Sequence, residues 1–138
     1  MAKLIVKAFA RTDWETAITG FDGLSLLQTW EYGETKMQTE PWQLERGVLL
    51  DGDKVIGACQ ALVKRLPIVG GGLVWVNRGP LFVTGDGNDG GDRLATILIA
   101  LRQYYVQSRG MYLRVAPPLG NEMFDPEQAR QAGYTVTK

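Results

Sequence analysis

The sequence contains no histidine. This absence excludes Ser-His-Asp and Cys-His nucleophile pairs, HExxH zinc proteases and most other zinc sites, because all of them use an imidazole. A general base would therefore have to be a carboxylate, a tyrosine or the substrate itself. We assign no catalytic residue and expect no metal site from the sequence.

Cysteine is almost as scarce, since Cys59 is the only one and no internal disulfide bond can form. A single cysteine is consistent with a reducing compartment. Cys59 lies in a predicted strand of small and apolar residues, with no histidine or CxxC partner to activate it. We therefore expect a buried thiol that packs as a small hydrophobic side chain.

Long apolar runs are also missing. The longest, at residues 94–101, is interrupted by Thr96 and is too short to cross a bilayer. Residues 1–10 are broken by Lys3 and Lys7 and lack the apolar core and cleavage site of a signal peptide. These features predict a cytoplasmic protein.

Net charge is absent as well, because 15 basic residues balance 15 acidic ones. A neutral chain gives no overall electrostatic attraction to nucleic acid or to anionic membranes, although a local basic cluster could still bind an anion. The 138 residues, 45% of them apolar, suit one globular domain, which we place at residues 1–138.

Strand patterns recur along the whole chain. We predict strands at residues 3–9, 42–50, 54–66, 73–77 and 111–115, and a last short strand opened by Gly133. Asp51-Gly52 separates the second strand from the third and is typical of a tight hairpin, because glycine accepts a positive φ.

Helix patterns lie between these strands. Asp13, Ser25 and Asp92 are N-cap candidates for three helices, and Pro126 fits the first turn of a fourth. Gly33 falls inside the second helix, where glycine costs about 1 kcal/mol relative to alanine.

The third helix is the clearest, with one apolar face and a terminating glycine: Leu94, Ile97, Leu98, Leu101, Tyr104, Tyr105 and Gly110. Residues 73–115 therefore read as a strand-helix-strand unit with one parallel pairing. The fold class is α/β (α+β), with a mixed central sheet flanked by helices.

Short segments stand in a distinctive order. Residues 27–36 read LQTWEYGETK, Arg78-Gly79-Pro80 follows a short strand, and QAGY at residues 131–134 follows a strand that ends in proline. Together with the hairpin, these segments resemble the motifs of the Fem-type aminoacyltransferases, in the N-terminal GNAT-like domain of that family. The sequence departs from the family at three positions. Where the family has tyrosine, proline and often an acidic residue, this chain has Trp75, Asn77 and Ala116 respectively.

The resemblance implies a bacterial cell-wall enzyme with a GNAT-like fold. Members of the family transfer an amino acid from aminoacyl-tRNA to the peptide stem of a nucleotide-linked peptidoglycan precursor. They carry two such domains with the precursor between them, and the resemblance covers only the first. It therefore implies a peptidoglycan precursor as partner, aminoacyl-tRNA as donor through a second domain, and no resident cofactor.

The resemblance also suggests site residues. Lys36 stands where the family has a lysine associated with precursor phosphates; the alternative is a solvated lysine favoured by the helix dipole. Arg78 can bind a carboxylate or phosphate at a strand end; the alternative is a surface ion pair. Trp30 and Trp75 are candidates to line the substrate site, although tryptophans more often pack in the core or at its rim. Gly79 and Pro80 are expected to set the direction of the chain.

Two other functions stay open. The first is a stand-alone GNAT N-acetyltransferase that uses acetyl-CoA on the glycine-rich segment 85–92. Asp86, Asp89 and Asp92 argue against it, because carboxylates repel a pyrophosphate. The second is a non-catalytic half-domain that binds a ligand or forms a homodimer, in which a second copy replaces the missing domain.

Overall fold

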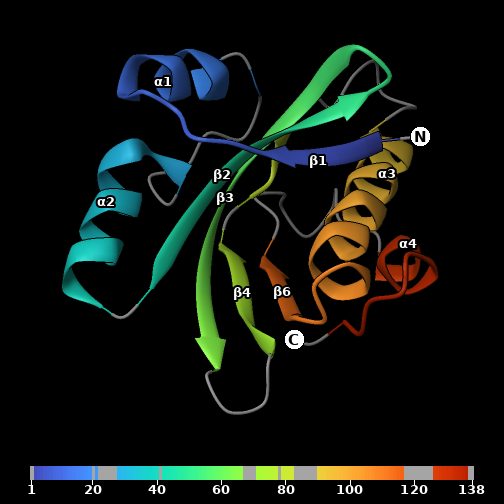
Figure 1. Cartoon of the computed structure of the whole chain (residues 1–138). Coiled ribbons are helices and arrows are strands. Elements are labelled where there is room, and N and C mark those ends of the chain that lie inside the picture. Colours follow the sequence, from blue (N-terminus) through green and yellow to red (C-terminus); the bar gives the residue numbers. More distant parts are fainter. Residues whose placement is uncertain are drawn as a thin grey trace.

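The computed structural model describes residues 2–19, 21, 28–40, 42–66, 71–77, 79–82, 90–116 and 126–136. The strands and helices follow one another in much the predicted order (Figure 1). Their bounds, in chain order, are β1 Ala2–Val6, α1 Arg11–Thr19, α2 Trp30–Thr39, β2 Gln43–Asp51, β3 Lys54–Leu66, β4 Gly71–Asn77, β5 Leu81–Phe82, α3 Gly90–Arg102, the π-helical turn η2 Gln103–Gln107, β6 Tyr112–Ala116 and α4 Pro126–Gln131.

One mixed sheet forms the centre of the molecule. Its strand order is β1-β2-β3-β4-β6, and the short β5 pairs with β3. All pairings are antiparallel except β4 with β6, whose parallel register runs from Leu73↔Tyr112 to Asn77↔Ala116. This confirms the predicted parallel pair and the mixed sheet. Figure 1 shows α1 and α2 on one side of the sheet and α3 with α4 on the other.

The hairpin between β2 and β3 is confirmed. Asp51 pairs with Lys54, and Gly52 between them has a φ of 63°. A side chain is strained at such a φ, so glycine fits this turn. β3 spans the predicted residues, whereas β1 ends three residues earlier than predicted.

The main apolar core lies between the sheet and α3. Val74 and Val76 point to this side of β4, and they are fully buried. The predicted apolar face is confirmed, because Leu94, Ile97, Leu98 and Leu101 of α3 and Tyr105 of η2 are all buried. Burying each such aliphatic side chain stabilises the fold by about 1.5–3 kcal/mol. Gly110, with a φ of 64°, ends this helical segment as predicted.

Three helix starts differ from the prediction. α2 begins at Trp30 with Thr29 as its N-cap, and Thr29 Oγ1 accepts a hydrogen bond from the Tyr32 N–H. The proposed cap Ser25 lies outside the described residues. α1 and α3 begin two residues before Asp13 and Asp92, so both aspartates lie in the first turn of their helices. The Asp13 carboxylate suits the helix dipole at this place.

The last predicted strand is wrong for the described residues 134–136, which form no strand. After α4, Gly133 has a φ of 97° and donates to Arg130, while Tyr134 donates to Ala129. This is the hydrogen-bond pattern of a glycine-terminated helix, so the Tyr134 N–H closes α4 instead of entering a sheet. Among the described helices, none is long and apolar enough to cross a membrane.

Candidate functional site

The face of the sheet that carries α2 holds a buried polar seam. Arg46 on β2 and Gln60 on β3 are direct cross-strand partners, and both side chains point toward α2. The Arg46 Nε–H donates to Gln60 Oε1 at 2.8 Å, and Gln60 Nε2 donates to the carbonyl of Thr29 at 2.9 Å. The cap of α2 is therefore fixed to the middle of the sheet by hydrogen bonds.

Gln28 extends this seam from the residue before the cap. Its Nε2 donates to the carbonyls of Gln60 and Asn77, and its Oε1 accepts from the Gln60 N–H. The side chain is fully buried, so each of these bonds replaces one that water would make. Gln28 thus joins α2 to the end of β4.

Arg46 is a buried cation. Its residue is only 8% exposed, and its guanidinium carbon lies 3.8 Å from the centre of the Trp30 ring. The nearest carboxylate, on Glu34, is 3.8 Å from Nη2. Burial lowers the pKa of Arg46 to about 10, and the Glu34 charge offsets this only in part. Arg46 remains charged at neutral pH and is held mainly by neutral acceptors and an aromatic face.

Trp30 lies at the start of α2 with its ring against this guanidinium. The ring is half-buried, and the neighbouring carbonyl of Trp30 accepts a hydrogen bond from Arg46 Nη2 at 3.2 Å. One face of the indole is therefore occupied by Arg46. Trp30 therefore supports the seam, and its half-buried ring also reaches the surface.

Gly79 and Pro80 lie at the same junction, joined by a cis peptide bond. A Cβ built on Gly79 would lie 2.7 Å from the amide carbon of Gln28, so only glycine fits here without a shift. Arg78 itself lies outside the described residues. Its chain neighbours Asn77 and Gly79 both contact Gln28, next to the cap of α2.

Lys36 lies near the other end of α2. Its Nζ makes an ion pair with Glu40 at 2.5 Å and lies 5.7 Å from the centre of the Tyr32 ring. The hydrogen bond to Glu40 is the main reason that the pKa of Lys36 is raised. The side chain is 28% exposed, so an incoming anion can compete with Glu40 for the ammonium.

Trp75 belongs to a second cluster on the same face of the sheet. It is the cross-strand partner of Leu62 and of Arg114, and it lies two residues from Asn77 on β4. Its ring lies 6.4 Å from that of Trp42, and the Arg114 guanidinium lies 5.9 Å from its centre. In the described part of the chain, the buried Trp75 Nε1 has no hydrogen-bond partner.

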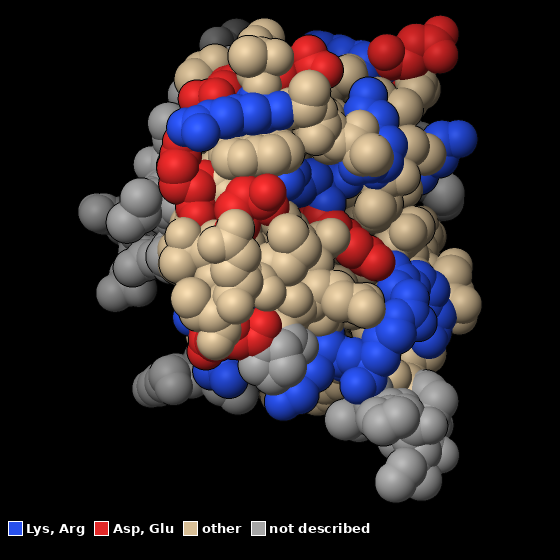
Figure 2. Space-filling view, turned by 60° about the vertical axis from the view of Figure 1, so that its left-hand side comes forward, with Lys and Arg blue, Asp and Glu red and all other residues tan. Residues whose placement is uncertain are grey.

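The predicted residues thus fall into separate groups. Trp30 and Gly79-Pro80 lie at the polar seam, Lys36 pairs with Glu40, and the Trp75 ring lies tilted against that of Trp42. Figure 2 shows acidic and basic side chains interspersed over this side of the molecule, with Lys and Arg gathered toward its lower right. The face offers cations beside aromatic surface, an arrangement suited to anionic groups and planar or sugar rings.

The opposite face carries a second polar cluster beneath η2. Glu45 accepts hydrogen bonds from the Tyr105 hydroxyl at 3.0 Å and from Arg109 Nη1 at 2.8 Å. Burial raises the pKa of Tyr105, so its hydroxyl stays protonated and donates. Cys59 is buried as predicted, and burial raises the pKa of its thiol to about 12. Neither group is a nucleophile at neutral pH.

Among the described residues, no group of three or more Cys, Asp or Glu side chains is placed to hold a metal ion.

The seam residues Arg46, Gln28 and Gln60 were not identified from the sequence. Gln28 lies in the LQTW segment, but Arg46 and Gln60 join it only through strand pairing. The one available signal was the adjacent charged pair Glu45-Arg46 inside a predicted strand, because neighbouring strand residues point to opposite faces of the sheet.

No family model and no curated protein matches the sequence. Among solved structures, the crystal structure of FemX is similar over 93% of this chain, with a TM-score of 0.62 and 19% identity. Two further structures match at lower TM-scores. An aminoglycoside acetyltransferase, meta-AAC0020, from an uncultured soil metagenomic sample gives 0.48 at 16% identity over 98% of this chain and 90% of its own. A transcriptional regulator from Bacillus halodurans C-125 gives 0.49 at 12% identity over 98% and 95%.

The chain therefore has the GNAT-like fold that the Fem-type resemblance implies, and this prediction is confirmed. Within that class, the similarity to FemX has a TM-score above 0.5. The chain spans 30% of the FemX chain.

Proposed function

We propose that this chain is a Fem-like acyltransferase domain that binds a nucleotide-linked peptidoglycan precursor and takes part in amino-acid transfer to its peptide stem. The observation that carries the proposal is the fold shared with FemX over 93% of the chain. Lys36 supports it, since its ammonium is accessible near the end of the α2 helix.

In this proposal, Lys36 and Arg78 contact the precursor phosphates, and Trp75 with Trp42 offers a ring surface beside them. Trp30 contributes by fixing the guanidinium of Arg46 and so the start of α2. Gly79 and Pro80 direct the chain past Gln28. Acyl transfer from an activated ester depends mainly on positioning and on stabilising the developing oxyanion, which suits a chain without histidine.

Residues 1–138 act as one domain in this proposal, in the cytoplasm where such precursors are made. Because the chain spans 30% of the FemX chain, the aminoacyl-tRNA donor is assigned to a further domain. The chain needs no resident cofactor for the proposed reaction.

A thermal shift experiment tests the proposal. A UDP-linked muramyl-pentapeptide at about 100 times its Kd should add ~2.7 kcal/mol of stability and raise the Tm by roughly 5 °C or more. Lys36→Ala should lose most of this rise, because the ammonium that faces the diphosphate is gone. Acetyl-CoA is measured in parallel.

Lys54→Ala is the matched control, since Lys54 is an exposed lysine on the β2–β3 hairpin. It should keep the full rise. An equal rise in Lys36→Ala would remove Lys36 from the site. A rise with acetyl-CoA and none with the muramyl nucleotide would replace the proposal by an N-acetyltransferase.

A further inference from the structure

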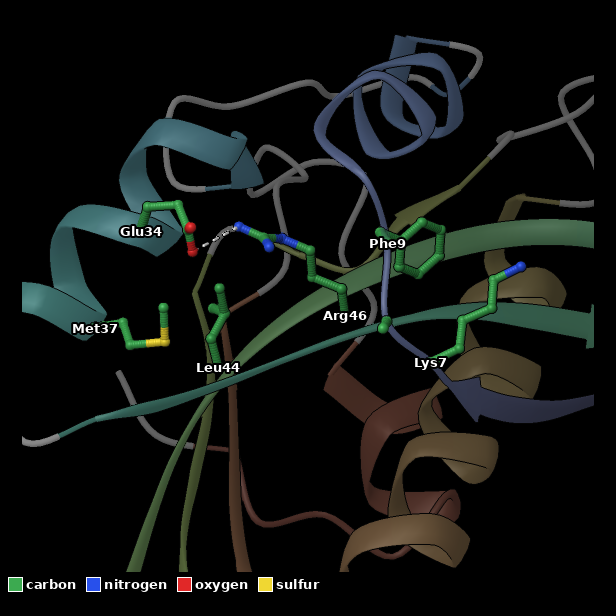
Figure 3. A pocket seen from close by; sticks show the side chains of 7 residues that line it. Lys7, Phe9, Glu34, Met37, Leu44 and Arg46 are labelled. Atoms are coloured by element: carbon green, nitrogen blue, oxygen red, sulfur yellow. Dashed lines mark ion pairs between the residues drawn. The ribbon is translucent and has the colours of Figure 1, made fainter.

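A small hollow opens between α2, β2 and the chain that follows β1. It is lined by residues from all three segments and has a volume of about 210 Å³: Lys7, Ala8, Phe9, Glu34, Met37, Leu44 and Arg46. Figure 3 shows the guanidinium of Arg46 extended from β2 toward Glu34 on α2, with Phe9, Met37 and Leu44 around it. None of the residues proposed above as precursor contacts lines it.

Arg46 gives the hollow a cation with unused donors. A guanidinium carries five N–H groups. Nε donates to Gln60, and Nη2 donates to the Trp30 carbonyl and faces Glu34. Nη1 has no acceptor among the described residues, and it is not fully enclosed by protein atoms. Because Arg46 lines the hollow, its two N–H groups are available to an acceptor that enters there.

This donor is unusual because Arg46 is a buried residue, with only 8% of its surface exposed. Hydrogen bonds to Gln60 and to the Trp30 carbonyl fix the direction of the guanidinium before any ligand arrives. A fixed, partly dehydrated guanidinium binds a carboxylate more strongly than a flexible surface arginine does. The lowered pKa of Arg46 agrees with this, since burial leaves its charge short of partners.

The other residues that line the hollow indicate which chemical groups would be attached to such an anion. Phe9, Met37 and Leu44 supply apolar surface, and Glu34 supplies one carboxylate. Lys7 does not compete for the anion, because its ammonium lies over the Phe9 ring at 5.0 Å and points away from Arg46 (Figure 3). At the ~30 Å³ that one water occupies in the liquid, the hollow has room for about seven non-hydrogen atoms.

We propose that this hollow binds the carboxylate end of a small apolar amino acid, either free or at the C-terminus of a peptide, with Arg46 Nη1 as its anchor. The short side chain lies against Phe9, Met37 and Leu44. Glu34 adds a contact for the ammonium of a free amino acid. A peptide terminus has no ammonium there, so its carboxylate meets the Glu34 charge uncompensated and should bind more weakly. The site goes beyond the proposed function and does not depend on it, because its contacts do not include Lys36 or Arg78.

An NMR titration tests the proposal with three probes: L-alanine, N-acetyl-L-alanine and L-alaninamide. We follow the Arg46 Nε–H signal and the indole N–H signals of the tryptophans. Both carboxylate probes should give saturable shifts at Arg46 and Trp30, and the amide should give none. Tighter binding of L-alanine identifies a free amino acid, whereas tighter binding of N-acetyl-L-alanine identifies a peptide terminus.

Met37→Trp fills the hollow from an exposed position on α2 and should weaken binding by about tenfold or more. Gln38→Trp is the matched control, because Gln38 is exposed on the next position and does not line the hollow; it should bind as the parent does. Both variants keep Arg46 and the seam intact. The proposal is overturned if acetate or chloride gives the same saturable shifts, if alaninamide does, or if Met37→Trp binds unchanged.

Discussion

At Gly33 the helix α2 lies directly against side chains of the sheet. A Cβ on this residue would lie 2.6 Å from Gln60 Oε1 and 2.9 Å from Arg46 Nη2. The sequence shows Gly33 only as a weak point in a helix pattern, because nothing local reveals what packs against it. The long-range pairing of β2 with β3 explains the residue, since it places Arg46 and Gln60 together under α2.

Gly33→Ala should therefore destabilise the protein, although the same change in an exposed helix stabilises by about 1 kcal/mol. The added methyl group must displace the Gln60 amide or the Arg46 guanidinium from the seam, at a cost of about 1–3 kcal/mol. Urea unfolding measures the net loss. Thr35→Ala, at an exposed position of the same helix, is the control and should be neutral or slightly stabilising. A more stable Gly33→Ala variant would show that α2 does not press on the seam.

At the scale of single elements, the sequence predicted well the turns and helix faces that depend on neighbouring residues. The hairpin at Gly52, the apolar face of α3 and the glycine at position 110 that ends the helical segment of α3 and η2 all follow from local spacing and backbone preference. The start of α2 did not, because Ser25 and Thr29 are both good N-caps and the choice depends on what Gln28 and Gln60 bind. The π-helical turn η2 also gave no local signal.

That turn is tied to the sheet through Tyr105, which predicts an asymmetry between two neighbouring tyrosines. Tyr105→Phe removes a hydrogen bond to the Glu45 carboxylate and should cost about 1.5–3 kcal/mol. Tyr104→Phe should be nearly neutral, since no hydrogen bond of its hydroxyl is found among the described residues. Chemical denaturation of both variants makes the comparison. Equal losses would mean that Glu45 relies on Arg109 alone.

At the scale of the whole molecule, the larger apolar core lies on the α3 side of the sheet. The α2 side holds the polar seam beside a smaller apolar cluster of Trp14, Ile18, Ala58 and Leu81. The order of elements let the resemblance predict a GNAT-like fold, and the similarity to FemX confirms it. The candidate site was harder to predict, because its parts come from α2, β2, β3 and β4 and meet only in the folded chain. Arg78 and the segment 85–89 lie outside the described residues, so their proposed roles stay predictions.

Cys59 reports on the opening of this whole structure. Its thiol is 2% exposed, and burial raises its pKa to about 12. At pH 8 a thiol reagent such as DTNB should leave the native protein unlabelled and react fully in denaturant. Because an unfolded thiol ionises near pH 9 and the folded one near 12, stability should also fall as the pH rises between these values. Rapid labelling without denaturant would reveal a local opening of β3.

The polar seam under α2 has a consequence for heat capacity. Exposing apolar surface raises the heat capacity of unfolding, whereas exposing amide and guanidinium groups lowers it. The contact of α3 with the sheet is built from Leu and Ile side chains, and the contact of α2 from Arg46, Gln28 and Gln60. The curvature of stability with temperature is therefore set mainly by the larger apolar core on the α3 side. Loosening the α2 contact changes the enthalpy of the protein far more than its heat capacity.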